Sequence, residues 1–376
     1  MHPDSLSASD RGTETATGPD MAALVEDIRR WGRELGFQQV GISGTDLGEH
    51  PAHLAQWLDD GYQANMEWLR EPKRVDPQAL IPGTQRIISL RMDYLPAEPR
   101  IHDILQDGRR AYIARYALGR DYHKIIRKRL QQLADRIVAA VGPFGYRAFV
   151  DSAPVLEKAL ASQAGLGWMG KHTVIINRKA GSWFFLGELF TDLPLPVDTP
   201  VSNHCGTCQA CIDICPTKAI VAPYVLDAGK CISYLTIEYR GVIPLELRRP
   251  IGNRIFGCDD CQLVCPWNRY AQASQEEAFT PRHAFDGPDL LELWDWNEET
   301  WLKQTEGMPL RRMNYASWVR NLSLALGNAP GSAAVMDALT QRFADMEAAG
   351  TLDDVLREHL LWAMDEQRLK LAASHA

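Results

Sequence analysis

The sequence predicts an N-terminal α/β domain, or more broadly an α+β domain, followed by a cysteine-rich module and an α-helical tail. Helical and strand periodicity alternate up to about residue 195, all eight cysteines lie between residues 205 and 265, and the chain after about residue 275 is helical and free of cysteine. The proline-rich segment 193–200 marks the first boundary. We therefore expect domains over residues 21–195, 196–275 and 276–376.

The composition is that of a globular protein with room for two or three domains. The chain has 376 residues, of which 45% are hydrophobic and 23% are charged. A formal net charge of −8 argues against a protein that coats nucleic acid generally. No apolar run approaches the ~18 residues that span a bilayer, and residues 1–20 form a polar, disordered leader without an apolar export segment. We expect a cytoplasmic protein with no membrane contact.

The first domain should begin with a helix and a strand. Apolar residues recur at helical spacing from Met21 to Gly36, and the apolar segment 37–42 then predicts a strand. The same criteria predict further helices at 54–69 and 122–141, and further strands at 86–90, 147–150, 173–176 and 183–186.

The first four cysteines have the spacing of a bacterial ferredoxin. Cys205, Cys208, Cys211 and Cys215 follow one another at steps of three, three and four, and a proline comes next. In a ferredoxin with two iron–sulfur clusters, the fourth cysteine of such a run binds the other cluster. The sequence therefore predicts a ferredoxin-like module with two clusters.

The remaining cysteines complete two sets of four. Cys258, Cys261 and Cys265 repeat the ending before a proline, but Ile255 stands where a first cysteine would be, so Cys231 is the remaining candidate. Crossed binding then assigns one 4Fe-4S cluster to Cys205, Cys208, Cys211 and Cys265, and the other to Cys215, Cys231, Cys258 and Cys261. Two structural zinc ions are the alternative. Two Cys-x-x-x-Cys-Pro endings favour iron–sulfur, and a reducing compartment disfavours disulfides.

The tail carries successive amphipathic helical patterns. Apolar residues recur at helical spacing around residues 318–326, 336–343 and 352–360. A HEAT-like helical repeat is one interpretation of this pattern, and ordinary helix packing is an equally good one.

A basic segment lies within this acidic chain. Residues 109–129 hold eight lysines and arginines against one acid, Asp121. Such a density indicates a phosphate-binding face, although a solvated helix surface would also produce it. The candidate phosphate contacts are Arg109, Arg110, Arg127, Lys128 and Arg129.

Four stretches together resemble the epoxyqueuosine reductases. They are Arg115-Tyr-Ala-Leu-Gly-Arg-Asp-Tyr-His123, Asp151-Ser-Ala-Pro-Val-Leu-Glu157, Gly165-Leu-Gly-Trp-Met-Gly-Lys-His172 and Gly257-Cys-Asp-Asp-Cys-Gln-Leu-Val-Cys-Pro-Trp-Asn268. The resemblance spans roughly residues 21–330. It implies an oxidoreductase with a cobalamin in the first domain beside two 4Fe-4S clusters, which reduces the epoxide of epoxyqueuosine at the wobble position of tRNA in the last step of queuosine biosynthesis. The reductant that supplies the electrons is not identified by the sequence.

The resemblance also implies which residues contact the cobalamin. Three glycines, Gly165, Gly167 and Gly170, would let the backbone approach a flat ligand closely, although tight turns alone would also require them. No histidine lies in an Asp-x-His-x-x-Gly context, so we expect cobalt without a protein histidine ligand. The expected contacts are Arg74, Arg115, Asp121, Asp151, Ser152, Trp168, Lys171, His172 and Ser182.

Asp151 is the candidate catalytic proton donor. It follows an apolar strand and begins a Ser-Ala-Pro turn, and a carboxylic acid shielded from water can have its pKa raised enough to donate near neutral pH. The alternative is that Asp151 caps the helix near Pro154. Asp121 is the competing carboxylate, but we expect the surrounding arginines to hold it ionised.

Two other functions would use the same cofactors in part. A reductive dehalogenase also pairs cobalamin with two 4Fe-4S clusters, but such enzymes usually have a twin-arginine leader and clusters near the C-terminus. A ferredoxin-type electron-transfer protein fused to an unrelated domain would leave the stretches around Asp121 and Asp151 unexplained.

Overall fold

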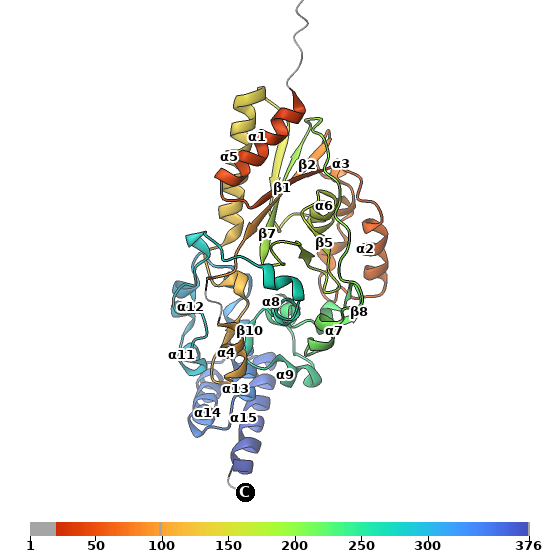
Figure 1. Ribbon diagram of the computed structural model, residues 1–376. Coiled ribbons are helices and arrows are strands. Elements are labelled where there is room, and N and C mark those ends of the chain that lie inside the picture. The colour runs from red at the N-terminus through yellow and green to blue at the C-terminus, as the bar shows by residue number, and fades with distance from the viewer. Residues whose placement is uncertain (1–19, 98–99, 375–376) are drawn as a thin grey trace, which may run out of the picture.

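The computed structural model describes residues 20–97 and 100–374 (Figure 1). The predicted leader therefore lies, apart from its last residue, outside the described residues. That residue, Asp20, is the N-cap of α1 (Met21–Glu34), where its carboxylate accepts hydrogen bonds from the N–H groups of Ala22 and Ala23. Capping of this kind satisfies two of the N–H groups that a helix start leaves unpaired.

An antiparallel sheet forms the centre of the first domain. Its strand order is β1-β2-β7-β4, and every neighbouring pair is antiparallel. The domain is therefore α+β rather than a parallel α/β fold, because no strand is joined to a parallel neighbour by a crossover helix. The four strands are β1 (Gln39–Ser43), β2 (Arg86–Asp93), β7 (Phe184–Thr191) and β4 (Tyr146–Phe149).

Alternation along the strands gives each face of the sheet its own helices. Ile88 and Leu90 of β2 pack in one core with α1 and α5 (Tyr122–Val141), whereas Ile87 packs on the other face with α6 (Glu157–Gln163). Successive side chains of a strand point to opposite faces, so both faces are covered. Figure 1 shows α1 and α5 lying together on one side of the sheet and α6 on the other.

The rest of this domain consists of short elements. The predicted helix at 54–69 ends early, because Gly61 has a φ of +74° and the chain turns there. The predicted strand at 173–176 keeps only its last two residues. The elements are α2 (His50–Asp59), α3 (Pro77–Leu80), α4 (Ile101–Gln106), β3 (Tyr112–Ile113), β5 (Trp168–Met169) and β6 (Ile175–Ile176).

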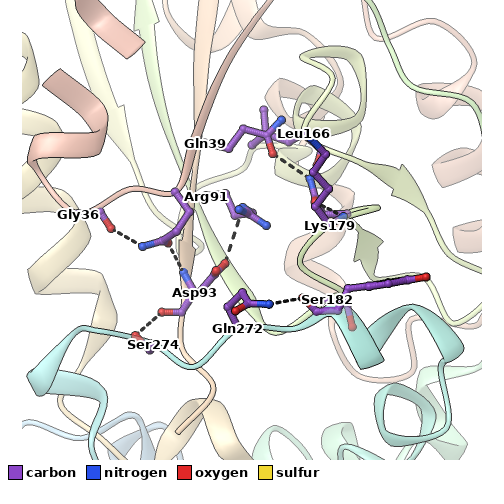
Figure 2. Close-up of polar contacts among 12 residues, drawn as sticks. Gly36, Gln39, Arg91, Asp93, Leu166, Lys179, Ser182, Gln272 and Ser274 are labelled. Atoms are coloured by element: carbon purple, nitrogen blue, oxygen red, sulfur yellow. Dashed lines mark hydrogen bonds and ion pairs between the residues drawn. The ribbon is translucent and has the colours of Figure 1, made fainter. Parts of the chain in front are cut away.

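The cysteine module is attached to the first domain by strand pairing and side-chain contacts. β10 (Arg254–Phe256) pairs in parallel with β3. At the end of β2, Ser274 Oγ donates to the carbonyl oxygen of Asp93 at 2.7 Å, beside the buried pair of Arg91 and Asp93 at 3.7 Å (Figure 2). Its other elements are α7 (Ala210–Ile214), β8 (Ile220–Ala222), β9 (Val225–Leu226), α8 (Ile232–Ile237), α9 (Leu245–Ile251) and α10 (Asp260–Leu263).

The tail shares a core with the cysteine module. Trp318 is buried in the same cluster as Ile232 and Phe256. At Gly327 a side chain would meet the ring of Trp362 at 2.7 Å, so glycine allows α13 and α15 to approach closely. The tail helices are α11 (Leu290–Trp294), α12 (Glu298–Gln304), α13 (Tyr315–Asn328), α14 (Ala333–Ala348) and α15 (Asp354–Ser374). Over residues 20–97 and 100–374, no helix is long and apolar enough to cross a membrane.

Candidate active site and cluster cavities

Asp151 is the central residue of a tight turn that follows β4. The N–H of Ser152 donates to the carbonyl oxygen of Val150 at 2.6 Å, and Asp151 between them has a φ of +54°. A three-residue turn with positive φ is rare and strained, although aspartate tolerates this region better than most residues. Strain of this kind is typical of functional sites.

The side chain of Asp151 points to the start of α5 and does not cap a helix. Its Oδ2 accepts a hydrogen bond from the hydroxyl of Tyr122 and lies 3.3 Å from Nε2 of His123. The helix that follows, α6, has Leu156 as its N-cap and no side-chain capping bond. The capping alternative for Asp151 is therefore wrong.

His123 joins the two aspartates that the sequence singled out. Its Nδ1 lies 2.7 Å from Oδ1 of Asp121, and its Nε2 faces Asp151. Asp121 is the N-cap of α5 and also accepts from the N–H of His123 at 3.1 Å. The ring of Tyr122 stacks between His123 and Phe185, with centroid distances of 4.1 and 3.9 Å. Capping and stacking together fix the imidazole between two carboxylates.

These contacts decide where a proton is held. Burial alone would lower the pKa of His123, but hydrogen bonds to Asp121 and Asp151 outweigh it and raise that pKa to about 9. Burial alone would raise the pKa of Asp151, but hydrogen bonds from His123 and Tyr122 bring it below its ordinary value. The expectation that Asp151 is shielded and has a raised pKa is therefore wrong, because a charged partner faces it and 58% of its side chain is exposed. The pKa of Asp121 is lowered chiefly by His123, not by arginines.

An open cavity of about 160 Å³ lies beside this group. Tyr122 and Asp151 form its polar side, together with Glu157 and Lys158. The rest of its lining is apolar and comes from β6, the residue before it and the start of β7: Val174, Ile175, Phe184, Phe185 and Leu186. An acid beside an apolar wall suits a reaction in which one proton is delivered to a substrate bound against that wall.

Four cysteines line a second cavity, of about 210 Å³. Cys211 and Cys265 are buried, and Cys208 is exposed. Burial, followed by the thiols of its neighbours, raises the pKa of Cys265 to about 11. The four cysteines are Cys205, Cys208, Cys211 and Cys265, the set that crossed binding predicts for one cluster. The structure thus brings together residues from both cysteine runs.

The other four cysteines are also neighbours. Burial raises the pKa of Cys231, with the thiol of Cys215 as a further cause. Burial likewise raises the pKa of Cys261 well above its usual range, and Cys231 is the nearest charged contributor. Cys258 lies in the same segment, and its thiol donates to Oδ2 of Asp260 at 2.8 Å. The isolated Cys231 thus lies where the missing cysteine of the second run was expected.

One short strand separates the two cavities. Ile175 of β6 lines the cavity beside Asp151, and Ile176 lines the cavity of the cysteines. Adjacent residues of a strand point to opposite faces, which explains why one residue belongs to each cavity. β6 therefore forms a thin apolar wall between the acid and the cysteine sulfurs.

Four of the residues expected to contact cobalamin lie on the cysteine side of this wall. Lys171 donates to the carbonyl oxygens of Gly206 and Cys208 at 2.7 and 2.8 Å, which ties down the first cysteine loop. His172 also lines the cysteine cavity, and burial lowers its pKa to about 4. Trp168 packs edge-on against Trp267, and Ser182 bonds to the side chain of Asn268.

The other expected contacts are more scattered. Asp121 and Asp151 flank His123, and the exposed Ser152 lies next to Asp151. Arg115 has no exposed side-chain surface: it pairs with Asp286 and donates to the carbonyl oxygen of Ile113 at 2.8 Å. Arg74 is buried, with its guanidinium over the ring of Trp68. The structure therefore groups three of these residues around the acid and encloses two arginines elsewhere.

All three glycines lie where the chain packs closely on itself. A side chain at Gly167 would meet the carbonyl oxygen of Ile176 at 2.3 Å, and one at Gly165, where φ is +73°, would meet that of Thr199 at 2.8 Å. A Cβ at Gly170 would come within 2.6 Å of Ile176. Tight turns thus account for these glycines.

The basic residues expected to bind tRNA differ in whether they are free at the surface or paired with an acid. Arg127 and Lys128 are exposed on α5, whereas Arg129 pairs with Glu276. Arg109 and Arg110 lie before β3, each near Asp107 at 3.4 Å. Arg129 is thus committed to an ion pair between the first domain and the cysteine module.

Sequence reasoning missed several residues of the site. His123 and Tyr122 were seen only as part of a motif, although the pattern Asp-Tyr-His at a helix start could have indicated a capped histidine next to an acid. Arg312 lies close enough to Asp151 to lower the pKa of that carboxyl, and it pairs with Glu238 at 2.7 Å. Nothing local in the sequence places it there.

Family comparisons agree with this arrangement. Residues 74–152 match the family described as epoxyqueuosine reductase QueG, DUF1730, and residues 204–268 match the 4Fe-4S double cluster binding domain. The second match contains all eight cysteines and supports iron–sulfur clusters over zinc.

Relatives match over nearly the whole chain. The epoxyqueuosine reductase of Pseudomonas aeruginosa is 61% identical over 92% of this chain and 95% of its own length. A crystal structure of epoxyqueuosine reductase with a tRNA-Tyr epoxyqueuosine-modified stem loop has a TM-score of 0.82 and 28% identity, covering 93% of this chain and 91% of that one. The Bacillus subtilis enzyme, described with its catalytic aspartate loop swung out of the active site, has a TM-score of 0.82 and 27% identity with the same coverage. This chain belongs to the epoxyqueuosine reductase family.

Proposed function

We propose that this chain reduces the epoxide of epoxyqueuosine in tRNA to the alkene of queuosine, with a cobalamin and two 4Fe-4S clusters as cofactors. The observation that carries the proposal is the arrangement around β6. A proton-holding group, Asp151 with His123, lies on one side of this strand, and the cysteine cavity lies on the other. Reductive removal of an epoxide oxygen needs protons and electrons at one place, and this geometry supplies both.

The residues present fit two iron–sulfur clusters. Thiolates are the ligands that hold such clusters, four to each cubane. The cavity of Cys205, Cys208, Cys211 and Cys265 opens to the surface at Cys208, which suits the entry of electrons from a reductant. The set of Cys215, Cys231, Cys258 and Cys261 would hold the other cluster.

The open cavity beside Asp151, of about 160 Å³, would hold only part of a cobalamin, and the remainder would extend beyond it. Its apolar lining of Val174, Ile175 and residues 184–186 would suit contact with the flat ring of that cofactor. Asp151 lines this cavity, with Ser152 and Asp121 near it, so these three would be the nearest of the expected contacts to a group bound there. Arg74, Trp168 and His172 lie outside this cavity, although each has a buried nitrogen without a hydrogen-bond partner among the described residues. When bound, cobalamin would supply a strongly nucleophilic metal centre for opening the epoxide.

The protein's own residues would manage the proton. Opening an epoxide leaves an alkoxide, which must be protonated by a group within hydrogen-bond reach. His123 is protonated at neutral pH, and its Nε2 faces the carboxylate of Asp151. We infer that Asp151 delivers to the substrate oxygen the proton that His123 carries, while Asp121 fixes the imidazole.

The substrate would reach this site along a basic surface. Arg127 and Lys128 are exposed on the helix that begins at Asp121, and Arg109 and Arg110 are further candidates for phosphate contact. We also propose that α13, α14 and α15 form a HEAT-like unit, on the basis of their packing: α15 contacts both α13 and α14.

Product analysis tests the function directly. The protein is reconstituted anaerobically with iron, sulfide and cobalamin, and incubated with a chemical reductant and epoxyqueuosine tRNA. Digestion and mass spectrometry should show queuosine, and a parallel incubation with a haloarene should show no halide release. Halide release without queuosine would mean that the protein is a dehalogenase instead. Protein without cobalamin is the matched control and should form no queuosine.

A further inference from the structure

An acid lies where the fold would accept an apolar residue. Glu188 is in the middle of β7, opposite Ser89 of β2 and Phe149 of β4, and has no exposed surface. Its neighbours on the same face, Leu186 and Phe190, pack in the clusters that contain α6. Within the described ranges no N–H or hydroxyl group donates to Glu188, and the carboxyl group that it meets is that of Glu157. A buried carboxylate that faces only another acid is costly when ionised, so Glu188 is expected to be neutral.

Glu157 connects this buried acid to the active site. It is the first residue of α6, it lines the cavity beside Asp151, and its Oε1 accepts a hydrogen bond from the main-chain N–H of Asp151. Its nearest carboxylates are Asp151 and Glu188. The donor of this hydrogen bond is the N–H of Asp151, the residue with a φ of +54°. The bond therefore acts on the strained turn itself.

One proton is shared by the pair. Two carboxyl groups in contact in a buried site do not both ionise. Burial, then the charge of Glu157, raises the pKa of Glu188 well above its usual range, whereas burial raises that of Glu157 to about 7, so Glu157 ionises first. Glu157 receives an N–H donor and faces His123, Lys158 and Arg74, whereas Glu188 receives no donor. The negative charge is therefore favoured on Glu157 and the proton on Glu188.

We propose that Glu157 is a positioning residue that holds Asp151 in its strained turn, and that Glu188 holds the proton of the pair whenever Glu157 carries the negative charge. A strained turn persists only when its surroundings fix it. The bond from Asp151 to Glu157 fixes the main chain, and those from Tyr122 and His123 fix the side chain. This role deepens the proposed function, since its activity readout depends on that function.

Hydrogen exchange of the reconstituted holoenzyme tests the role without any turnover. In Glu157→Ala, the amides of residues 150–156 should lose protection, and in Glu157→Gln they should lose less, because the amide oxygen still accepts a hydrogen bond. Glu188→Gln, which imitates the protonated acid, should keep wild-type protection. Asp353→Ala is the matched control: it removes a carboxylate that accepts from the main-chain N–H of Leu356, far along the chain in the tail.

Single-turnover kinetics with epoxyqueuosine tRNA give the second readout. Glu157→Ala should lower the rate at saturating tRNA ~10-fold or more, the effect of a misplaced acid, while the concentration for half-maximal rate stays unchanged. Wild-type protection and rate in Glu157→Ala would overturn the role of Glu157. A loss in Glu188→Gln as large as in Glu157→Ala would overturn the assignment of the proton. Failure of the wild type to form queuosine would count against the proposed function only, because the exchange result stands without it.

Discussion

His123 beside Asp151 and His172 in the cysteine cavity have opposite electrostatic surroundings. His123 lies between Asp121 and Asp151, with 28% of its side chain exposed, and these carboxylates raise its pKa to about 9. His172 is 3% exposed beside the cysteine cavity, where no carboxylate compensates for burial and its pKa falls to about 4. One imidazole is charged at neutral pH and the other is neutral.

The difference shows how one fold separates proton chemistry from electron transfer. The acid side of β6 concentrates groups that gain and lose protons, whereas the cysteine side combines four thiols with a neutral imidazole and the cations of Lys171 and Arg269. Cations of this kind would offset the negative charge of thiolate-bound clusters, whose potentials depend on charge and solvent exposure. The experiments below change one side at a time.

The largest effect is expected on the cysteine side, at the residue that lies outside both runs. Cys231→Ala should lower the iron content of the anaerobically reconstituted protein from about eight to about four per chain, and abolish queuosine formation. Iron and sulfide assays measure this directly, and Thr340→Ala, at an exposed position on α14 in the tail, is the control. Eight iron atoms in the variant would show that another group completes the second cluster, and zinc in the wild type would exclude iron–sulfur altogether.

On the acid side, Asp151→Asn should lower single-turnover reduction by ~10²-fold or more, the size expected for loss of general acid catalysis. Cluster content, cobalamin binding and tRNA affinity should stay unchanged, because the amide keeps the shape of the carboxylate. Asp121→Asn is the informative companion variant. If Asp151→Asn were fully active and Asp121→Asn inactive, the proton would be delivered by the other carboxylate.

The sequence predicted the cluster side better than the acid side. Cysteine spacing is a local pattern with a direct chemical meaning, so even Cys231 could be assigned by elimination, and the structure brings it near Cys215 and Cys261. The helix at 122–141 and the strands at 86–90 and 183–186 were also predicted, because their periodicity is strong. The antiparallel order of these strands was not predicted, because periodicity carries no information on strand direction.

The pKa of Asp151 could not be predicted because its partner is 28 residues away. Strand position suggested a shielded acid, but shielding and a charged partner shift the pKa in opposite directions. Only the fold places His123 against Asp151. The surroundings of Glu188 were equally out of reach, because the sequence shows only one acid in an apolar strand. The location of Lys171 and His172 at the cysteine cavity also depends on the fold.

A smaller effect is expected at His123 itself. His123→Gln keeps hydrogen-bonding groups but cannot carry a proton, so the single-turnover rate should fall about tenfold. In the wild type the proton is present below pH 9 and lost above it, so the rate should decline as the pH rises through about 9. The variant should lack that decline.

The raised pKa of His123 also implies that this residue stabilises the fold fully below pH 6.5, and that the stabilisation is lost as the pH rises through 9. An unchanged pH profile in His123→Gln would remove His123 from the proton path.

The smallest effect is expected on the surface, where the two regions share one substrate. Arg127 and Lys128 are exposed and unpaired with any acid in the described part of the chain, so the double variant Arg127→Ala/Lys128→Ala should weaken tRNA binding without disturbing the fold. Each lost phosphate contact should reduce the slope of log K against log salt by roughly 0.7 to 0.9.

Arg129 is unsuitable for this test, because removing it would leave Glu276 without its partner. Arg312→Ala is the comparison: Arg312 lies near Asp151, so it should affect the rate of reduction as well as binding. An unchanged affinity and salt slope in the double variant, with a loss in Arg312→Ala, would move the phosphate-binding surface from α5 to the mouth of the acid cavity.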